Sequence, residues 1–193
     1  MAVSTNFNPA QIAYYEKSGW EAYYDRNWLR AFWLLVQLNR EQFHMSPFIA
    51  LLAALDTVRA SVAFAPVDND VPKATYFIER FFAKARHSLH IRADAKTLAA
   101  LEMDYWIVHR QLAVRRQQNH NNVNIELMVQ SLANLHAALF DSTPALMRRS
   151  AELRALAAQT VDRITGRYST DVAGDWRQVE AHLYEAYQAV QRA

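Results

Sequence analysis

The sequence has no cysteine and very little glycine or proline, and each shortage excludes a group of structures or functions. Without cysteine among its 193 residues, the chain has no disulfide, no thiolate nucleophile and no cysteine-ligated zinc or iron–sulfur centre. With 3 glycines and 5 prolines it has little material for β-turns, and it contains no GxGxxG, GxxxxGK[ST] or GxSxG motif. The enzyme classes built on these glycine-rich motifs are therefore excluded.

Neither sign of charge is in large excess. The formal net charge is +2, and the basic pairs at Arg115-Arg116 and Arg148-Arg149 are short and not interleaved with aromatic residues, so we expect no nucleic-acid partner. The first residues, MAVSTNFNPAQ, lack the basic and apolar regions of a signal peptide. The sequence thus predicts a soluble, cytoplasmic protein without a membrane partner.

The periodicity of apolar residues and the recurring helix-start signals are typical of an all-α protein. Asn8-Pro9, Ser46-Pro47 and Thr143-Pro144 each place a capping residue before a proline at the first helical position. Helices are predicted over 9–25, 27–44, 47–65, 71–90, 94–117, 123–140, 144–167 and 172–191, and the first two could form one bent helix. Asn122 or Asn124 is predicted to start the sixth helix, and the polar stretch 115–122 is predicted to be a loop. We therefore expect residues 1–193 to form a single-domain antiparallel bundle of about seven or eight helices.

The segment 47–65 is almost entirely apolar, yet it carries Asp56 and Arg59 one helical turn apart. A helix that is apolar all round is normally buried on every side, so we expect the central helix of the bundle here, with a charged pair inside or at the rim of the core. One interpretation is an arginine that holds an anionic ligand, with Asp68 and Asp70 of the following loop shaping the mouth of a pocket. The alternative is a structural ion pair, with Asp70 as a helix cap and Asp68 as an exposed loop acid.

Aromatic residues are spaced four apart at Trp20, Tyr24, Trp28 and Phe32, so on one continuous helix they form a stripe. This stripe could be the wall of a pocket for a flat or hydrophobic ligand, and Tyr24 and Trp28 are then candidate ligand-binding residues. The alternative is ordinary core packing with tyrosine hydroxyls at the surface.

Glu102 and His109 lie nearly two turns apart on the predicted helix 94–117, and both point toward the core or its edge. This Glu-x6-His spacing resembles the first half of the ligand set of heme-oxygenase-like di-iron oxidases. The resemblance implies an iron or manganese cofactor held by a bundle-type oxidase. Glu41, His44, His182 and Glu185 are the candidates in this chain for the further ligands. The alternative is a set of surface charges with one hydrogen-bonded core histidine at His109.

Four charged residues of the seventh predicted helix fit a solvated face with local ion pairs; they are Glu152, Arg154, Asp162 and Arg163. Two functional interpretations remain open. The first is a helical-bundle protein that binds a small hydrophobic or anionic ligand or a protein partner, and the second is the metal-dependent oxidase. The supply of tyrosine and tryptophan also suits a homodimer interface. Whether the chain is an enzyme is left open.

Overall fold

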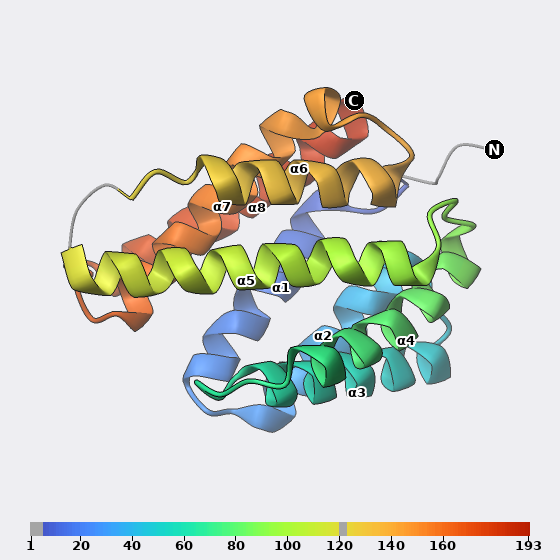
Figure 1. The fold of residues 1–193 in the computed structure, drawn as a ribbon, viewed down its shortest axis with the longest axis horizontal. Helices are drawn as coiled ribbons and strands as arrows, with labels where there is room; N and C mark the ends of the chain where they lie inside the picture. The colour runs from blue at the N-terminus through green and yellow to red at the C-terminus, as the bar shows by residue number, and fades with distance from the viewer. Residues whose placement is uncertain (1–5, 120–122) are drawn as a thin grey trace.

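A computed structural model describes residues 6–119 and 123–193 and arranges them as eight α-helices (Figure 1). The helices are α1 (Pro9–Tyr24), α2 (Trp28–Phe43), α3 (Pro47–Phe64), α4 (Val71–Leu89), α5 (Ala95–Asn119), α6 (Glu126–Phe140), α7 (Pro144–Thr165) and α8 (Val172–Arg192). No strand occurs in these two ranges. The predicted antiparallel all-α bundle is confirmed, and the predicted helix bounds differ from the observed ones by no more than three residues.

Polar side chains cap the helix starts as the sequence indicates. The Asn8 side chain accepts hydrogen bonds from the backbone N–H groups of Ala10 and Gln11, and Asp70 accepts one from Lys73 N at 3.0 Å. The same role falls to Ser46, Thr143 and Asp171 at the starts of α3, α7 and α8. These caps satisfy backbone donors that the first turn of a helix leaves unpaired.

The first two helices are separate, so the predicted aromatic stripe is broken. Arg26 has a left-handed backbone with φ 59°, and the Asn27 side chain caps α2 by accepting from Arg30 N. The chain reverses here, and α1 packs beside α2. The stripe required one continuous helix through Arg26 and Asn27, and the two separate helices do not provide it.

The end of α5 also differs from the expectation. The helix continues to Asn119, so the predicted loop over 115–122 is helical through its first five residues. Residues 120–122, which include Asn122 as a predicted start of α6, lie outside the described residues. Asn124, the other predicted start, accepts a hydrogen bond from Glu126 N at 2.8 Å.

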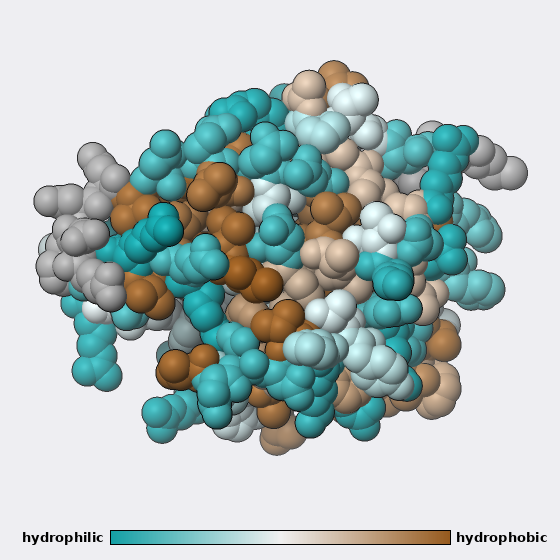
Figure 2. All heavy atoms as spheres, in the orientation of Figure 1, coloured by the Kyte–Doolittle hydropathy of each residue, from teal (hydrophilic) through white to brown (hydrophobic). Residues whose placement is uncertain are grey.

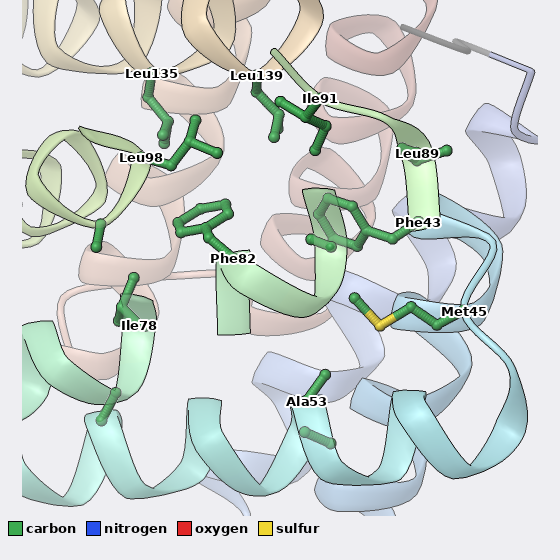
Figure 3. Close-up of a cluster of buried hydrophobic side chains, with 14 of the residues drawn as sticks. Phe43, Met45, Ala53, Ile78, Phe82, Leu89, Ile91, Leu98, Leu135 and Leu139 are labelled. Carbon is green, nitrogen blue, oxygen red and sulfur yellow. The ribbon is translucent and has the colours of Figure 1, made fainter. Parts of the chain in front are cut away.

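The bundle is built from pairs of neighbouring helices on either side of α5. In Figure 1, α5 crosses the middle of the view, with α6, α7 and α8 above it and α2, α3 and α4 below. A core of buried apolar side chains joins α2, α3, α4 and α5 to α6, and Figure 3 shows Phe43, Phe82, Leu98 and Leu135 among them. Hydrophilic residues cover most of the face seen in Figure 2, where hydrophobic ones gather near its middle.

The apolar helix expected near 47–65 is α3, and it differs from the expectation in how its side chains are distributed. Four of the six buried residues of α3 are alanines, and Figure 3 shows Ala53 pointing from α3 toward the core. Only 39% of α3 is buried. Among the described residues α3 is the one helix with the length and hydropathy to cross a membrane, features that core helices share.

Candidate functional site

The buried carboxylate of Asp56 on α3 is surrounded by three cationic side chains. Lys84 Nζ on α4 donates to Asp56 Oδ2 at 2.6 Å, and Arg80 Nε on α4 donates to Oδ1 at 3.2 Å. Arg59, the partner expected from the sequence, lies farther away, with its Nη1 3.8 Å from Oδ1. The Asp56 side chain is 2% exposed, so the two α4 residues stabilise a charge that burial alone would make very costly.

A groove lies beside this cluster, between α3 and α4. It is shallow and largely open to solvent, has a volume of about 310 Å³, and is lined by Ile49, Arg80, Ala83, Lys84, His87 and Ser88. The apolar part of the lining comes from Ile49 and Ala83, and the cations come from the same Arg80 and Lys84 that hold Asp56. Arg80 is 47% exposed, so its guanidinium is within reach of a molecule in the groove.

The other residues expected at a ligand pocket are placed elsewhere. Asp70 caps α4 and Asp68 is exposed in the loop before it, which is the arrangement of the structural alternative. Tyr24 and Trp28 are exposed around the α1–α2 turn, where the Tyr23 ring contacts both of theirs edge-on. Arg59 stacks over the Phe77 ring at 5.8 Å. The lining of the groove includes none of these residues.

Glu102 and His109 do not converge on a common metal site. Each forms a hydrogen bond with a different partner. Glu102 Oε1 accepts from Trp106 Nε1 on the same helix at 2.7 Å, and burial raises the pKa of the Glu102 carboxyl. His109 Nε2 lies 3.1 Å from Asp162 Oδ1 on α7, and the His109 ring stacks on Tyr105. A metal centre needs at least three converging donors. In residues 6–119 and 123–193 no group of three His, Cys, Asp or Glu side chains could hold an ion.

The further ligands considered from the sequence are dispersed over two helices. Glu41 accepts a hydrogen bond from the Asn8 backbone N–H at 2.9 Å, and His44 ends α2 in a left-handed conformation. On α8, burial lowers the pKa of His182, and Glu185 lies 3.8 Å from Arg149 of α7. Within the part of the chain that the structure describes, none of these four residues forms a hydrogen bond or ion pair with Glu102 or His109.

Sequence reasoning missed a buried polar cluster that joins α1, α7 and α8. Both terminal nitrogens of Arg154 donate to the Glu16 carboxylate, one of them at 2.9 Å, and Tyr187 Oη donates to the same carboxylate at 2.5 Å. Burial alone would lower the pKa of Arg154, but the charge of Glu16 raises it well above its ordinary value. The assignment of Arg154 to a solvated face was wrong.

Asp162 is the second residue of the predicted solvated face of α7 that lies inside the bundle. Its carboxylate holds Arg116 Nη1 and His109, both from α5. Arg116 is 5% exposed, and its Nε and Nη2 have no hydrogen-bond partner among the residues that the structure describes. Glu152, in contrast, makes the expected local pair, 3.0 Å from Arg148 Nε one turn earlier. The helical spacing of Arg154 and Asp162 puts them on one face, but no local signal shows that α1, α5 and α8 cover it.

Comparison with known proteins adds no assignment to this geometry. The chain matches no protein-family model, no curated protein sequence and no solved structure.

Proposed function

We propose that this protein binds a small anionic amphiphile in the groove between α3 and α4. The observation that carries the proposal is the excess of cations at Asp56, where Arg59, Arg80 and Lys84 surround a single carboxylate. Of these, Arg80 and Lys84 line the groove and outnumber the one carboxylate between them, so a net positive charge remains there. An anionic group placed there gains attraction from side chains that the fold already holds in position.

The lining of the groove also favours a ligand with an apolar part. Ile49 and Ala83 offer hydrocarbon surface next to the Arg80 and Lys84 cations. Small-molecule sites typically combine mostly apolar walls with a few charged groups that fix orientation. A volume of about 310 Å³ lies at the small end of such sites. A short alkyl chain with a carboxylate or sulfonate head has both properties.

A second groove of about 440 Å³ lies between α1 and α8, and its lining favours neither anions nor cations. Its charged lining consists of Arg177 and Glu180, one of each sign, so it offers no net charge to attract an ion. The positive groove between α3 and α4 is therefore the stronger candidate.

The test is isothermal titration calorimetry with octanoate and with 1-octanol, which has the same chain length and no charge. Octanoate is expected to bind at least about tenfold more tightly, and its affinity is expected to fall as salt is added, because exposed charges are screened. Arg80→Gln should weaken octanoate binding, and Ala83→Trp should abolish it by filling the groove without changing its charge.

Two exposed residues of α5 provide matched controls, Lys96→Gln for the charge and Ala100→Trp for the bulk. Both variants are expected to bind octanoate as the wild type does. Equal affinity for octanoate and 1-octanol, or unchanged binding by Ala83→Trp, would show that the groove is not the site.

A further inference from the structure

The exposed face of α3 carries large apolar side chains, whereas its buried face carries mostly alanine, with Asp56 at its middle and Phe64 at its end. The residues it buries completely are alanines 50, 53, 54 and 60. Its exposed apolar residues are Phe48, Leu51, Leu55, Val58 and Val62, which are between 36% and 68% exposed. Surface helices usually show the reverse arrangement, so this face is built for contact with something outside the described chain.

The spacing of the exposed residues indicates what kind of contact this is. From Phe48 to Val62 they follow one another at intervals of three, four, three and four, which is the a/d pattern of a coiled-coil seam. Such a seam is complementary to another helix with the same pattern. We propose that α3 pairs with α3 of a second copy of this chain, antiparallel and centred on Leu55.

Charge at the two ends of the seam favours a second copy in this orientation. Arg40 is exposed about one turn before the end of α2, which a short loop joins to α3, and Asp68 is exposed in the loop just after α3 ends. Antiparallel pairing brings each Arg40 toward the Asp68 of the other copy, and it also opposes the two helix dipoles favourably.

The neighbouring helix supplies the additional surface that a stable dimer needs. A specific interface takes about 800 Å² from each partner, which is more than five side chains of one helix provide. On α2, which packs beside α3, Leu29 is 86% exposed and Trp33 is 60% exposed. The interface we infer therefore consists of the five exposed apolar residues of α3 with Leu29 and Trp33 of α2, and none of these lines the groove beside Lys84.

The absence of cysteine from the chain allows a direct test by engineered disulfides. In the proposed register Leu55 meets its own copy, so Leu55→Cys should form a cross-linked dimer under mild oxidation. Phe48 is seven residues from the centre, so the two Phe48→Cys positions would lie about 21 Å apart, too far for a disulfide. Phe48→Cys alone should therefore stay uncross-linked, whereas a mixture of Phe48→Cys and Val62→Cys should give the heterodimer.

Sedimentation velocity over about 5–200 µM protein gives the second readout. The wild type should approach twice the 22.2 kDa of one chain, and Leu55→Glu should remain a monomer, because it places two carboxylates at the centre of the seam. Leu127→Glu, at an exposed position of α6, is the matched control and should dimerise as the wild type does. Circular dichroism checks that each variant is folded.

Three results would overturn the proposal. The first is a wild type that is monomeric over the whole concentration range. The second is a Phe48→Cys protein that cross-links with itself, as parallel pairing requires. The third is a monomer that binds anionic vesicles through Leu55. Octanoate binding is measured separately, so failure of this interface leaves the groove between α3 and α4 unaffected.

Discussion

Arg154 on α7 makes a two-pronged contact with the carboxylate of Glu16 on α1, 138 residues earlier in the chain. Tyr187 of α8 donates a third hydrogen bond to the same carboxylate. Glu16 is 5% exposed, so its charge is acceptable only while these partners are present. This contact ties the first helix to the last two.

Removing the arginine should strongly destabilise the fold. Arg154→Met leaves the Glu16 carboxylate buried without a cation, and loss of one partner of a buried pair costs about 3–5 kcal/mol in the free energy of unfolding. Urea denaturation followed by circular dichroism measures this cost. Arg148→Met is the matched control, since Arg148 makes a similar two-pronged contact with Glu126 at the exposed surface, and it should change stability far less. Equal effects of the two substitutions would contradict this account of the buried contact.

His136 should make the stability of the protein sensitive to acid. Burial, together with the nearby charge of Arg154, lowers the pKa of His136 to about 3, and its Nδ1 lies 3.0 Å from Ser150 Oγ. In the unfolded chain a histidine titrates near pH 6.5, so between about pH 6.5 and 3 the unfolded state binds a proton that the folded state does not. Unfolding free energy should therefore fall by about 1.4 kcal/mol for each pH unit below about 6.5.

The contribution of His136 is isolated by comparing the wild type with His136→Gln in urea titrations from pH 7 to pH 4. The variant lacks the titrating group, so its stability should fall less steeply over this interval. Parallel curves for the two proteins would mean that His136 is not held neutral in the folded state.

Glu102 should show the opposite dependence on pH. Burial raises the pKa of its carboxyl, and Arg154 and the hydrogen bond from Trp106 only partly oppose this. Between the unfolded and the folded pKa the folded state binds the extra proton, so stability is greatest below the unfolded pKa and is lost as pH rises through the folded one. Glu102→Gln keeps an acceptor for Trp106 and removes the charge.

The Glu102→Gln variant should therefore unfold at a higher urea concentration than the wild type at pH 8, and this gain should disappear near pH 4. The same comparison tests the oxidase interpretation. If Glu102 were a metal ligand, protein prepared with added iron or manganese would lose stability on substitution instead of gaining it.

The sequence predicted the features that depend on residues close together in the chain, which are the positions of the helices and their caps. Helix periodicity and the caps at Asn8 and Asp70 located the helices because both act within one or two turns. Those signals could not show that Asp56 pairs chiefly with Lys84, 28 residues away, or that Glu16 covers Arg154. A charged residue on a helix is compatible with either solvent or a distant counter-charge, and only the packing of the helices decides between them.

The face of α3 shows the same limit. Composition alone indicated a helix buried on every side, because Pro47–Phe64 is apolar at nearly every position. Alanine and leucine count alike in such a pattern, but the small residues allow close approach to α4 and most of the large ones, Phe64 excepted, remain outside. Size, not hydrophobicity, distinguishes the two faces.

Around Asp56 the cations should contribute unequally, in the order of their distances. Lys84→Met removes the contact at 2.6 Å and should cost about 1.5–3 kcal/mol, typical of a hydrogen bond to a charged group. Arg59→Met should have little effect on urea denaturation, because Arg59 is 54% exposed and 3.8 Å from the carboxylate. In a protein that carries Asp56→Asn, the additional change Lys84→Met should cost nothing, since the charge that Lys84 stabilises is then gone. A cost of Lys84→Met that persists in combination with Asp56→Asn would mean that Lys84 acts through its packing and not through the carboxylate.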